Sequence, residues 1–305
     1  MKYLCIKATM FSQVFIITVK TPFGVTVPCA FFLCPDKELD TYRAVFASLK
    51  EQGIDGPQLF YCDFEMAIIK GMKLVFDRSE IRCCDTHFKR AIRSNIQHHH
   101  LMELYNNNNS FQQFIRHLWS LSLVPTQDIV RVWTDVVLPL IPHHEAEGCE
   151  NDDTVLEEDF ETWDADEDDV NDFIEYFERT WVGRLNQRNG LRKNPRYHFG
   201  LWSKYETIKQ GDDTTTNSSE GFNNAISLSI PRNASIWSLI HQFKTEESVM
   251  HIKLKEGISG VDKEKGKRRS KDRIAKQEAL RAIVNNYDYI PIKDYISNIV
   301  GFFNM

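Results

Sequence analysis

Short apolar runs typical of strands alternate with stretches of helical spacing along the first part of the chain. Val14–Val19 and Val25–Cys34 are rich in β-branched and aromatic residues, and the turn-forming residues Lys20–Gly24 separate them. This pattern predicts two strands. In Glu38–Gln52 the apolar residues recur at helical spacing, and Gly53 then supplies a C-terminal stop.

The alternation continues to about residue 100. Leu59–Cys62 and Ile81–Cys84 predict short strands, whereas Phe64–Phe76 and the basic stretch Phe88–Gln97 predict helices. Leu4–Lys7 is a candidate for a strand that precedes the others. The order β-β-β-α-β-α-β-α predicts an α/β fold, with a mixed sheet that carries helices on its faces.

The rest of the chain has a mostly helical pattern. Helices are predicted at Phe111–Leu123, Gln127–Leu138, Asp172–Val182, Thr214–Ile230 and Ile236–Ile252. Gln187–Tyr197 is polar and basic, which is typical of a loop, and Ser259–Lys271 is a charged linker that precedes a short apolar C-terminal helical region.

Charge changes this picture because it is unevenly distributed. Between Glu145 and Glu178 there are 17 acidic residues and no Lys or Arg. Outside that window 26 acidic residues stand against 37 basic ones, so a net charge of −6 conceals a body with a charge of +11. A cationic body favours a polyanionic partner. The aliphatic-poor part of the window, up to about Asp169, is expected to be disordered.

Composition excludes several classes of protein. With 42% hydrophobic residues in 305, the chain can bury a sizeable core and is not disordered throughout. It has no apolar run of 18 residues, which excludes a membrane-spanning helix. Its seven cysteines lack a repeated spacing and are expected to be free thiols, and the first 15 residues lack a cleavable signal pattern. We expect a soluble intracellular protein.

Two motifs offer candidate chemistry at strand ends. Asp63 follows a predicted strand and Glu65 comes two residues later, where carboxylates can hold divalent cations. The alternative is a helix N-cap at Asp63, which position alone favours. Cys84 and His87 have the spacing of half a zinc site. No second such pair is evident, so a packed cysteine and a hydrogen-bonded histidine are favoured. The histidines 98–100 cannot all face one ion.

Two further segments stand out later in the chain. Thr214–Asn224 is a cap-rich helix start in which Glu220 and Asn224, one turn apart, share a face. An ordinary capping cluster is the favoured alternative for this segment. Lys263–Arg273 contains seven basic residues, which is typical of a solvated linker, of nuclear import or of nucleic-acid contact.

Several blocks, in order and spacing, resemble the transposase domain of Mutator-like elements (MULE). The blocks are Phe11–Gln13, Thr41–Arg43, Tyr61–Ala67, Cys84–Ile92, Thr216–Asn224 and Ser235–Ile240. The resemblance covers roughly residues 11 to 252, which is most of the chain. It implies a ribonuclease-H-like fold, in agreement with the order of elements above.

The resemblance also implies a DDE-type nuclease site. In such a site three carboxylates hold two divalent ions, Mg²⁺ or Mn²⁺, that drive DNA cleavage and strand transfer. Asp63 matches the second catalytic and metal-binding acid, and Glu220 matches the proposed third. Cys84 and His87 match a Cys-x-x-His element expected to give structural support near the site.

The first acid departs from the family pattern. It is expected in an Asp-Gly-Thr-Phe-like motif about 12 residues before the Phe-x-Gln that Phe11–Gln13 matches. That count reaches Met1, where Met-Lys-Tyr-Leu stands instead. We expect either a truncated gene model or a decayed copy, with no metal ion necessarily bound. Losing one ligand of a two-metal site should disable cleavage.

The resemblance divides the chain into a core and an insertion. Residues 1–100 form the first part of the ribonuclease-H-like core, and 101–213 form a helical insertion that contains the acidic segment at about 145–169. Residues 214–252 supply a core-closing helix and the helix after it. Residues 253–305 are a basic linker and a helical tail.

The sequence thus supports two functional hypotheses. The first is a MULE transposase-derived protein, inactive as given, in the nucleus, which binds DNA weakly and without sequence preference. The second is a host-recruited, non-enzymatic DNA- or protein-binding module on the same fold. A second copy of the chain is a further candidate partner, whereas a membrane or a small-molecule cofactor is not expected. The ordered motifs disfavour a third interpretation, an unrelated helical interaction protein.

Overall fold

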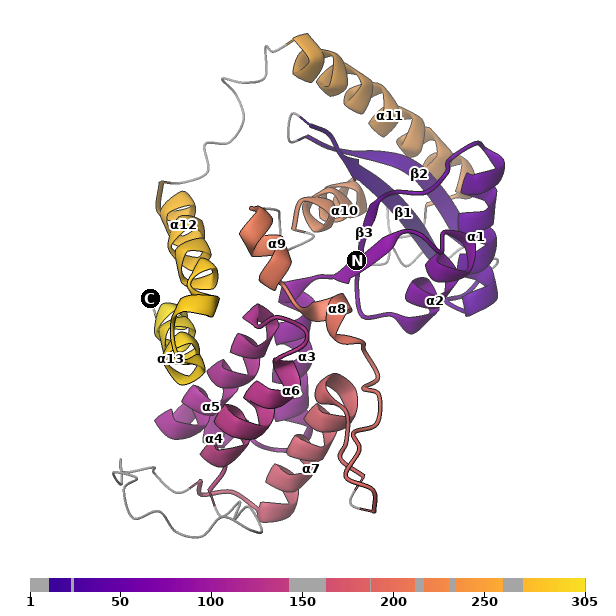
Figure 1. The fold of residues 1–305 in the computed structure, drawn as a ribbon. Coiled ribbons are helices and arrows are strands. Elements are labelled where there is room, and N and C mark those ends of the chain that lie inside the picture. The colour runs from indigo at the N-terminus through magenta and orange to yellow at the C-terminus, as the bar shows by residue number, and fades with distance from the viewer. Residues whose placement is uncertain are drawn as a thin grey trace, which may run out of the picture. The chain divides into compact units, whose positions relative to one another are not determined.

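A computed structural model describes residues 11–22, 25–142, 163–186, 188–211, 217–230, 234–259 and 271–304 (Figure 1). The chain divides into two compact units. The first unit combines Met1–Arg82 with Thr216–Lys271, and the second combines Cys83–Thr215 with Asp272–Met305. Each unit therefore brings together segments that are distant in the sequence.

A β-hairpin lies at the centre of the first unit. Strands β1 (Gln13–Lys20) and β2 (Thr26–Cys34) pair antiparallel, with Gln13 opposite Cys34 and Lys20 opposite Thr26. Successive side chains of a strand point to opposite faces, and in β1 the residues of both faces are buried at positions 13–17. Helices must therefore cover the hairpin on both sides.

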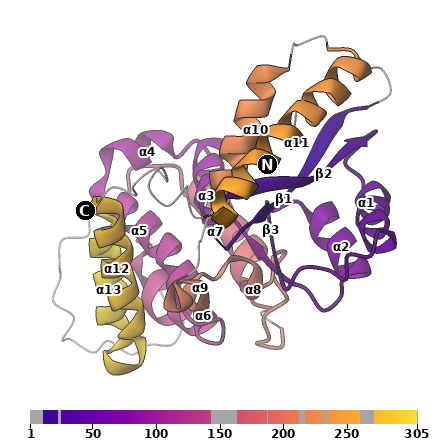
Figure 2. The same cartoon turned by 90° about the horizontal axis from the view of Figure 1, so that it is seen from above.

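Helices α10 (Asn217–Ser229) and α11 (Ile236–Ser259) cover one face. The core formed there contains Val14, Ile16, Val27, Phe222, Ile226, Leu239 and Met250. Phe31 of β2 stacks on Phe243 of α11, with ring centroids 4.3 Å apart. Figure 2 shows α10 and α11 side by side along the strands. Residues from the two ends of the first unit thus share one core.

Helix α1 (Leu39–Glu51) covers the other face, where Phe15 meets the rings of Tyr42 and Phe46. As predicted, Gly53 follows the end of this helix with a φ of +84°. Its amide donates to the Lys50 carbonyl, and the Ile54 amide donates to Leu49, which is the Schellman arrangement. Helix α2 (Met66–Val75) packs beside α1.

Strands β3 (Leu59–Cys62) and β4 (Glu80–Cys83) form a separate two-stranded sheet. Within the described residues the expected mixed sheet is therefore two small sheets, and the prediction of one sheet needs this correction. The candidate strand Leu4–Lys7, which the sequence places before the hairpin, lies outside those residues. The mixed α/β character and the order of strands and helices agree with the prediction.

The second unit is helical. Its helices are α3 (Asp85–His98), α4 (Met102–Asn107), α5 (Asn109–Ser120), α6 (Ile129–Val132), α7 (Glu167–Phe177), α8 (Phe199–Trp202), α9 (Tyr205–Gln210), α12 (Lys271–Asn285) and α13 (Ile292–Phe303). Short 3-10 segments lie at Leu121–Leu123, Leu138–Leu140 and Tyr287–Tyr289, and π-helical turns at Trp133–Val137 and Glu178–Val182. Helix α13 lies against α5, and the Tyr295 hydroxyl donates to the Leu123 carbonyl.

One sequence prediction for this unit needs correction. Helix α7 begins at Glu167 rather than Asp172, so the acidic segment at about 145–169 is helical in its last three residues. Its residues 145–162 lie outside the described ranges, as do residues 260–270 of the basic linker. The loop predicted at Gln187–Tyr197 contains no helix or strand in its described residues, 188–197, where a single β-bridge joins Arg192 to Leu185.

Candidate functional site

Asp63 occupies the turn between β3 and α2. It directly follows the strand, in which Phe60 and Cys62 are buried, and is itself half-buried. Helix α2 begins only at Met66, and its N-cap residue is Glu65, whose side chain makes no capping hydrogen bond. Asp63 is therefore not the N-cap, which removes the alternative that its sequence position favoured.

Glu65 takes part in a hydrogen-bonded chain that crosses the first unit. The Tyr42 hydroxyl on α1 donates to Glu65 Oε1 at 2.8 Å, and Gln13 Nε2 on β1 donates to the Tyr42 oxygen at 3.1 Å. Gln13 also donates to the Asp36 carbonyl at 2.9 Å. Burial raises the pKa of Glu65, and it raises the pKa of Tyr42 to about 12. This chain is called the Gln13–Tyr42–Glu65 network below.

The Gln13–Tyr42–Glu65 network connects three of the sequence blocks on which the family resemblance rests. Sequence reasoning did not identify it. A signal was present, because Gln13 opens an apolar strand and is fully buried, and a buried amide needs a hydrogen-bonding partner. The network attaches Glu65, which follows Asp63 in the same turn, to β1 and α1.

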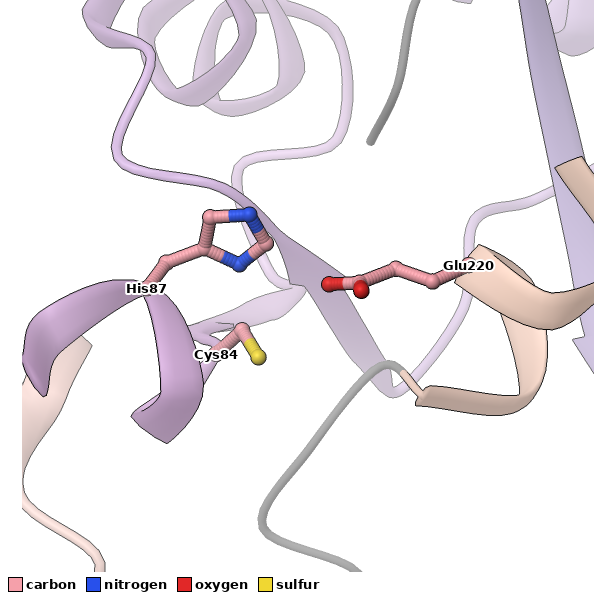
Figure 3. Close-up of side chains that lie close together, drawn as sticks. All are labelled: Cys84, His87 and Glu220. Atoms are coloured by element: carbon pink, nitrogen blue, oxygen red, sulfur yellow. The ribbon is translucent and has the colours of Figure 1, made fainter. Parts of the chain in front are cut away.

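Glu220 lies in the first turn of α10 and is half-buried (Figure 3). Its neighbour Ser219 shares a 2.8 Å hydrogen bond with Thr18 of β1, although the two residues are 201 positions apart. Phe222 and Ile226 on the same helix belong to the core above the hairpin. The helix that carries Glu220 is thus anchored to the first strand described. Asn224, expected on the same face, is exposed.

Cys84 and His87 lie at the start of α3 in the second unit (Figure 3). Cys84 is the buried N-cap residue, and its carbonyl accepts from the amides of His87 and Phe88, both at 3.1 Å. The sulfur and a ring nitrogen of His87 lie within 4.8 Å of one another. Arg90 Nη1 lies 3.4 Å from His87 Nε2.

The residues around this pair form a dense aromatic support. The Phe88 ring stacks on Trp202 at 5.0 Å and meets Trp181 edge-on at 4.8 Å. The ammonium group of the buried Lys204 donates a hydrogen bond to the Cys83 carbonyl oxygen. These contacts fix the start of α3, where Cys84 and His87 lie.

The three consecutive histidines are divided between α3 and the turn after it. His98 ends α3, and His100 has a φ of +57°. His99 turns toward α7, where its ring lies 6.4 Å from Phe173 and 6.5 Å from Tyr176. Burial lowers the pKa of His99. The backbone thus turns between the second and third of these residues.

Asp63 and Glu220 are the carboxylates of the first unit that the sequence analysis proposes as ligands of a divalent cation. Asp63 and Glu220 both belong to this unit and offer the hard oxygen ligands that Mg²⁺ or Mn²⁺ prefers. Among the described residues of the unit, however, neither belongs to a set of three Asp, Glu, His or Cys ligands gathered within it.

Comparisons with protein-family models, with curated proteins and with solved structures found no match to this chain.

The described residues also bear on membrane-spanning helices and on the state of the cysteines. No helix in the described ranges has the length and apolar character needed to cross a bilayer. The described cysteines, Cys29, Cys34, Cys62, Cys83 and Cys84, are free thiols, as their spacing predicts.

Proposed function

We propose that this chain is a transposase-derived domain of the MULE type, with a ribonuclease-H-like first unit, that binds DNA without cutting it. The observation that carries the proposal is the return of α10 to the β1–β2 hairpin. The Thr18–Ser219 hydrogen bond and the core shared with α10 place Glu220 in the same unit as Asp63. The family resemblance requires this long-range association.

The arrangement of the insertion supports the same proposal. Between Cys83 and Thr215 the chain builds a separate helical unit before it returns to the first one. A long helical insertion between the last core strand and the closing helix is what the resemblance implies. The Gln13–Tyr42–Glu65 network adds support because it gives motif residues at three positions a shared structural role.

The proposed lack of cleavage follows from the carboxylates. Asp63 and Glu220 match two of the three acids that the resemblance implies, and no residue of the printed sequence has been matched to the first. A two-metal site stabilises both the attacking and the leaving oxygen, so it depends on a full set of fixed ligands. With two of the three acids, the chain would hold such ions poorly.

DNA binding follows from charge. Outside the acidic window the chain carries a charge of +11, and phosphate contacts by Lys and Arg supply most of the affinity of sequence-independent binding. The nucleus is the compartment in which such a protein would meet DNA. The basic run Lys263–Arg273 has the composition of a nuclear import signal.

The test is a binding titration of the full chain against fluorescently labelled 30-base-pair duplexes of two unrelated sequences. We expect dissociation constants in the range of roughly 10⁻⁴–10⁻⁶ M at physiological salt, similar for both sequences, that rise steeply with salt. Absence of binding at about 50 mM salt would contradict the proposal, because electrostatic binding is strongest there. A strong preference for one duplex would contradict its sequence independence.

A protein-binding module on the same fold is the second candidate. It is favoured by two apolar side chains at the adjoining ends of α10 and α11, where Leu228 is 89% exposed and Trp237 is 77% exposed. Large exposed apolar residues are common at protein interfaces. Loss of partner binding in Trp237→Ala, with DNA binding unchanged, would support this candidate.

A further inference from the structure

A strongly basic segment directly follows the acidic window in the sequence. From Arg179 to Tyr205 the chain contains seven Lys or Arg residues and no Asp or Glu. Six of the seven lie between Arg179 and Arg196, and five of these six are arginines. A guanidinium binds a phosphate with two parallel hydrogen bonds, which a lysine cannot do. The composition therefore favours phosphate recognition.

This segment folds back on itself as a narrow hairpin between α7 and α8 (Figure 1). The Lys193 amide donates to the Arg184 carbonyl at 2.9 Å, and the Asn186 amide donates to the Leu191 carbonyl at 2.9 Å. Gly190, with a φ of +67°, allows the reversal at the tip. We call residues 184–186 and 188–193 the basic hairpin.

The base of the basic hairpin is held firmly. Arg192 donates to Glu178 Oε1 at 2.8 Å and to the Gly183 carbonyl at 2.7 Å, and Trp133 donates to the same Glu178 oxygen. Just beyond the hairpin, the Arg196 amide donates a hydrogen bond to the Arg179 carbonyl. Arg192 is thus a structural residue, and the hairpin is organised before any ligand binds.

The other basic residues point to solvent. Arg179, Arg184, Arg188, Lys193 and Arg196 are all exposed. Arg184 forms an ion pair with Glu175 at 2.8 Å, and the Arg196 guanidinium lies over the Tyr197 ring. Within the described ranges, Arg188 and Lys193 have no carboxylate at ion-pair distance. The tip and one arm of the hairpin therefore present uncompensated positive charge.

We propose that the basic hairpin binds the phosphate backbone of duplex DNA, an inference that rests on the proposed function and locates its DNA contact. The major groove admits a two-stranded β-ribbon, and the basic hairpin has a similar two-armed form, joined by one β-bridge between Leu185 and Arg192 and by two backbone hydrogen bonds. Its cations would then face the phosphates. Because the hairpin is already ordered, binding does not incur the entropy cost of folding a disordered basic tail. Leu185 and Leu191, both exposed, lie beside these cations and offer apolar contact to sugars.

The experiment compares two double charge reversals in the full chain. Arg188→Glu with Lys193→Glu changes the hairpin, and Lys70→Glu with Arg78→Glu makes the same change of net charge at exposed sites of the first unit. Binding of a labelled 30-base-pair duplex is followed by fluorescence anisotropy between about 50 and 200 mM salt. Circular dichroism checks that each variant is folded.

We expect the hairpin variant to bind at least tenfold more weakly and the slope of log affinity against log salt to fall in magnitude by about 2, one unit for each lost phosphate contact. The control should lose less than threefold. Equal losses in the two variants would overturn the hairpin proposal and leave the proposed function standing. Failure of the unmodified chain to bind would overturn both.

A second arm identifies the ligand. Duplex RNA has a deep, narrow major groove that protein side chains cannot read. The unmodified chain should therefore bind duplex RNA of the same sequence more weakly than DNA, and the hairpin substitutions should matter less. Equal affinity for RNA with the same loss in the hairpin variant would overturn the choice of duplex DNA as the ligand.

Discussion

At the scale of single residues, the hydroxyl of Tyr42 joins the first strand described to the turn that carries Asp63. It accepts a hydrogen bond from Gln13 and donates one to Glu65, and both Gln13 and Tyr42 are fully buried. Buried polar groups that lose their partner carry the full cost of desolvation. Loss of the Tyr42 hydroxyl should therefore lower the stability of the first unit.

Tyr42→Phe removes that oxygen and keeps the ring that packs on Phe15. We expect the free energy of unfolding to fall by about 1–3 kcal/mol, because Gln13 and Glu65 each lose a buried partner. Chemical denaturation measures the change. The matched control Tyr289→Phe alters an exposed ring and should change stability by less than ~0.5 kcal/mol. Equal effects of the two variants would contradict a structural role for the network.

Glu65→Gln tests the electrostatics of the same network. Because burial raises the pKa of Glu65, the folded chain binds this proton more tightly than the unfolded chain, and stability falls as the pH rises through the folded pKa. Glutamine carries no charge and can still accept from Tyr42. We expect the stability of the variant relative to the unmodified chain to increase as the pH rises above the ordinary pKa of a glutamate, about 4.3.

Urea denaturation at several pH values measures this difference. The control Glu103→Gln removes a charge from an exposed position of α4 and should show no comparable trend. A stability difference that stays constant with pH, or that reverses sign, would show that Glu65 is not buried as described.

The sequence identifies some of these residues and not others. Asp63 is found from its place after an apolar strand, because strand ends of α/β sheets are frequent sites. The role of Gln13 and Tyr42 cannot be found in this way. The network residues come from separate elements, and only the tertiary structure brings them together. Glu220 is reached through the family resemblance, since a glutamate in a cap-rich first turn is by itself unremarkable.

At the scale of elements, the hairpin β1–β2 depends on helices from both ends of the first unit. Its two faces bury alternate residues of one strand, against α1 on one side and against α10 and α11 on the other. A two-stranded hairpin is marginally stable alone. Helix α10 is therefore a structural part of the first unit.

Ile226→Ala tests this role. Ile226 is 1% exposed in the core above the hairpin, whereas Leu228 on the same helix is 89% exposed. We expect Ile226→Ala to cost about 2–5 kcal/mol through lost burial and a residual cavity. Leu228→Ala should change stability by less than ~0.5 kcal/mol. Thermal or chemical unfolding compares them, and indistinguishable variants would show that α10 does not pack on the hairpin.

Gly183→Ala tests the base of the basic hairpin. Gly183 has a φ of +96°, and a Cβ there would lie 2.1 Å from the Lys193 carbonyl oxygen. We expect a loss of at least about 1–3 kcal/mol from backbone strain alone. Gly301→Ala, in an open position of α13, should be neutral or stabilising by up to about 1 kcal/mol. A Gly183→Ala variant as stable as the unmodified chain would contradict the described approach of the two arms.

Elements were easier to predict than their ends. From Gln13 to His98 the elements follow the predicted order, because these strands and helices have clear periodicities and turn residues between them. The start of α7 was missed because its acidic first turn resembles a disordered segment. Asp166 in fact accepts from the Asp168 amide, and the acids that follow face the positive end of the helix dipole. The basic hairpin was missed because its pairing is short and its residues are polar.

At the scale of the whole molecule, the chain leaves the first unit after Arg82 and returns to it at Thr216. Such an insertion can diversify contacts with partners while the core keeps its fold. Asp63 and Glu220 lie in the first unit, and the basic hairpin lies in the second. We propose that the protein holds DNA and leaves its strands intact.

The most direct test of this account is a strand-cleavage assay on DNA that the protein has bound. A 5′-labelled duplex at saturating protein is incubated with Mg²⁺ or Mn²⁺, and native and denaturing gels of the same reactions report binding and cleavage. The account predicts a shifted duplex whose strands stay intact, both for the unmodified chain and for Asp63→Ala. Metal-dependent cleavage by the unmodified chain that is lost in Asp63→Ala would contradict it, because the chain would then contain a complete nuclease site.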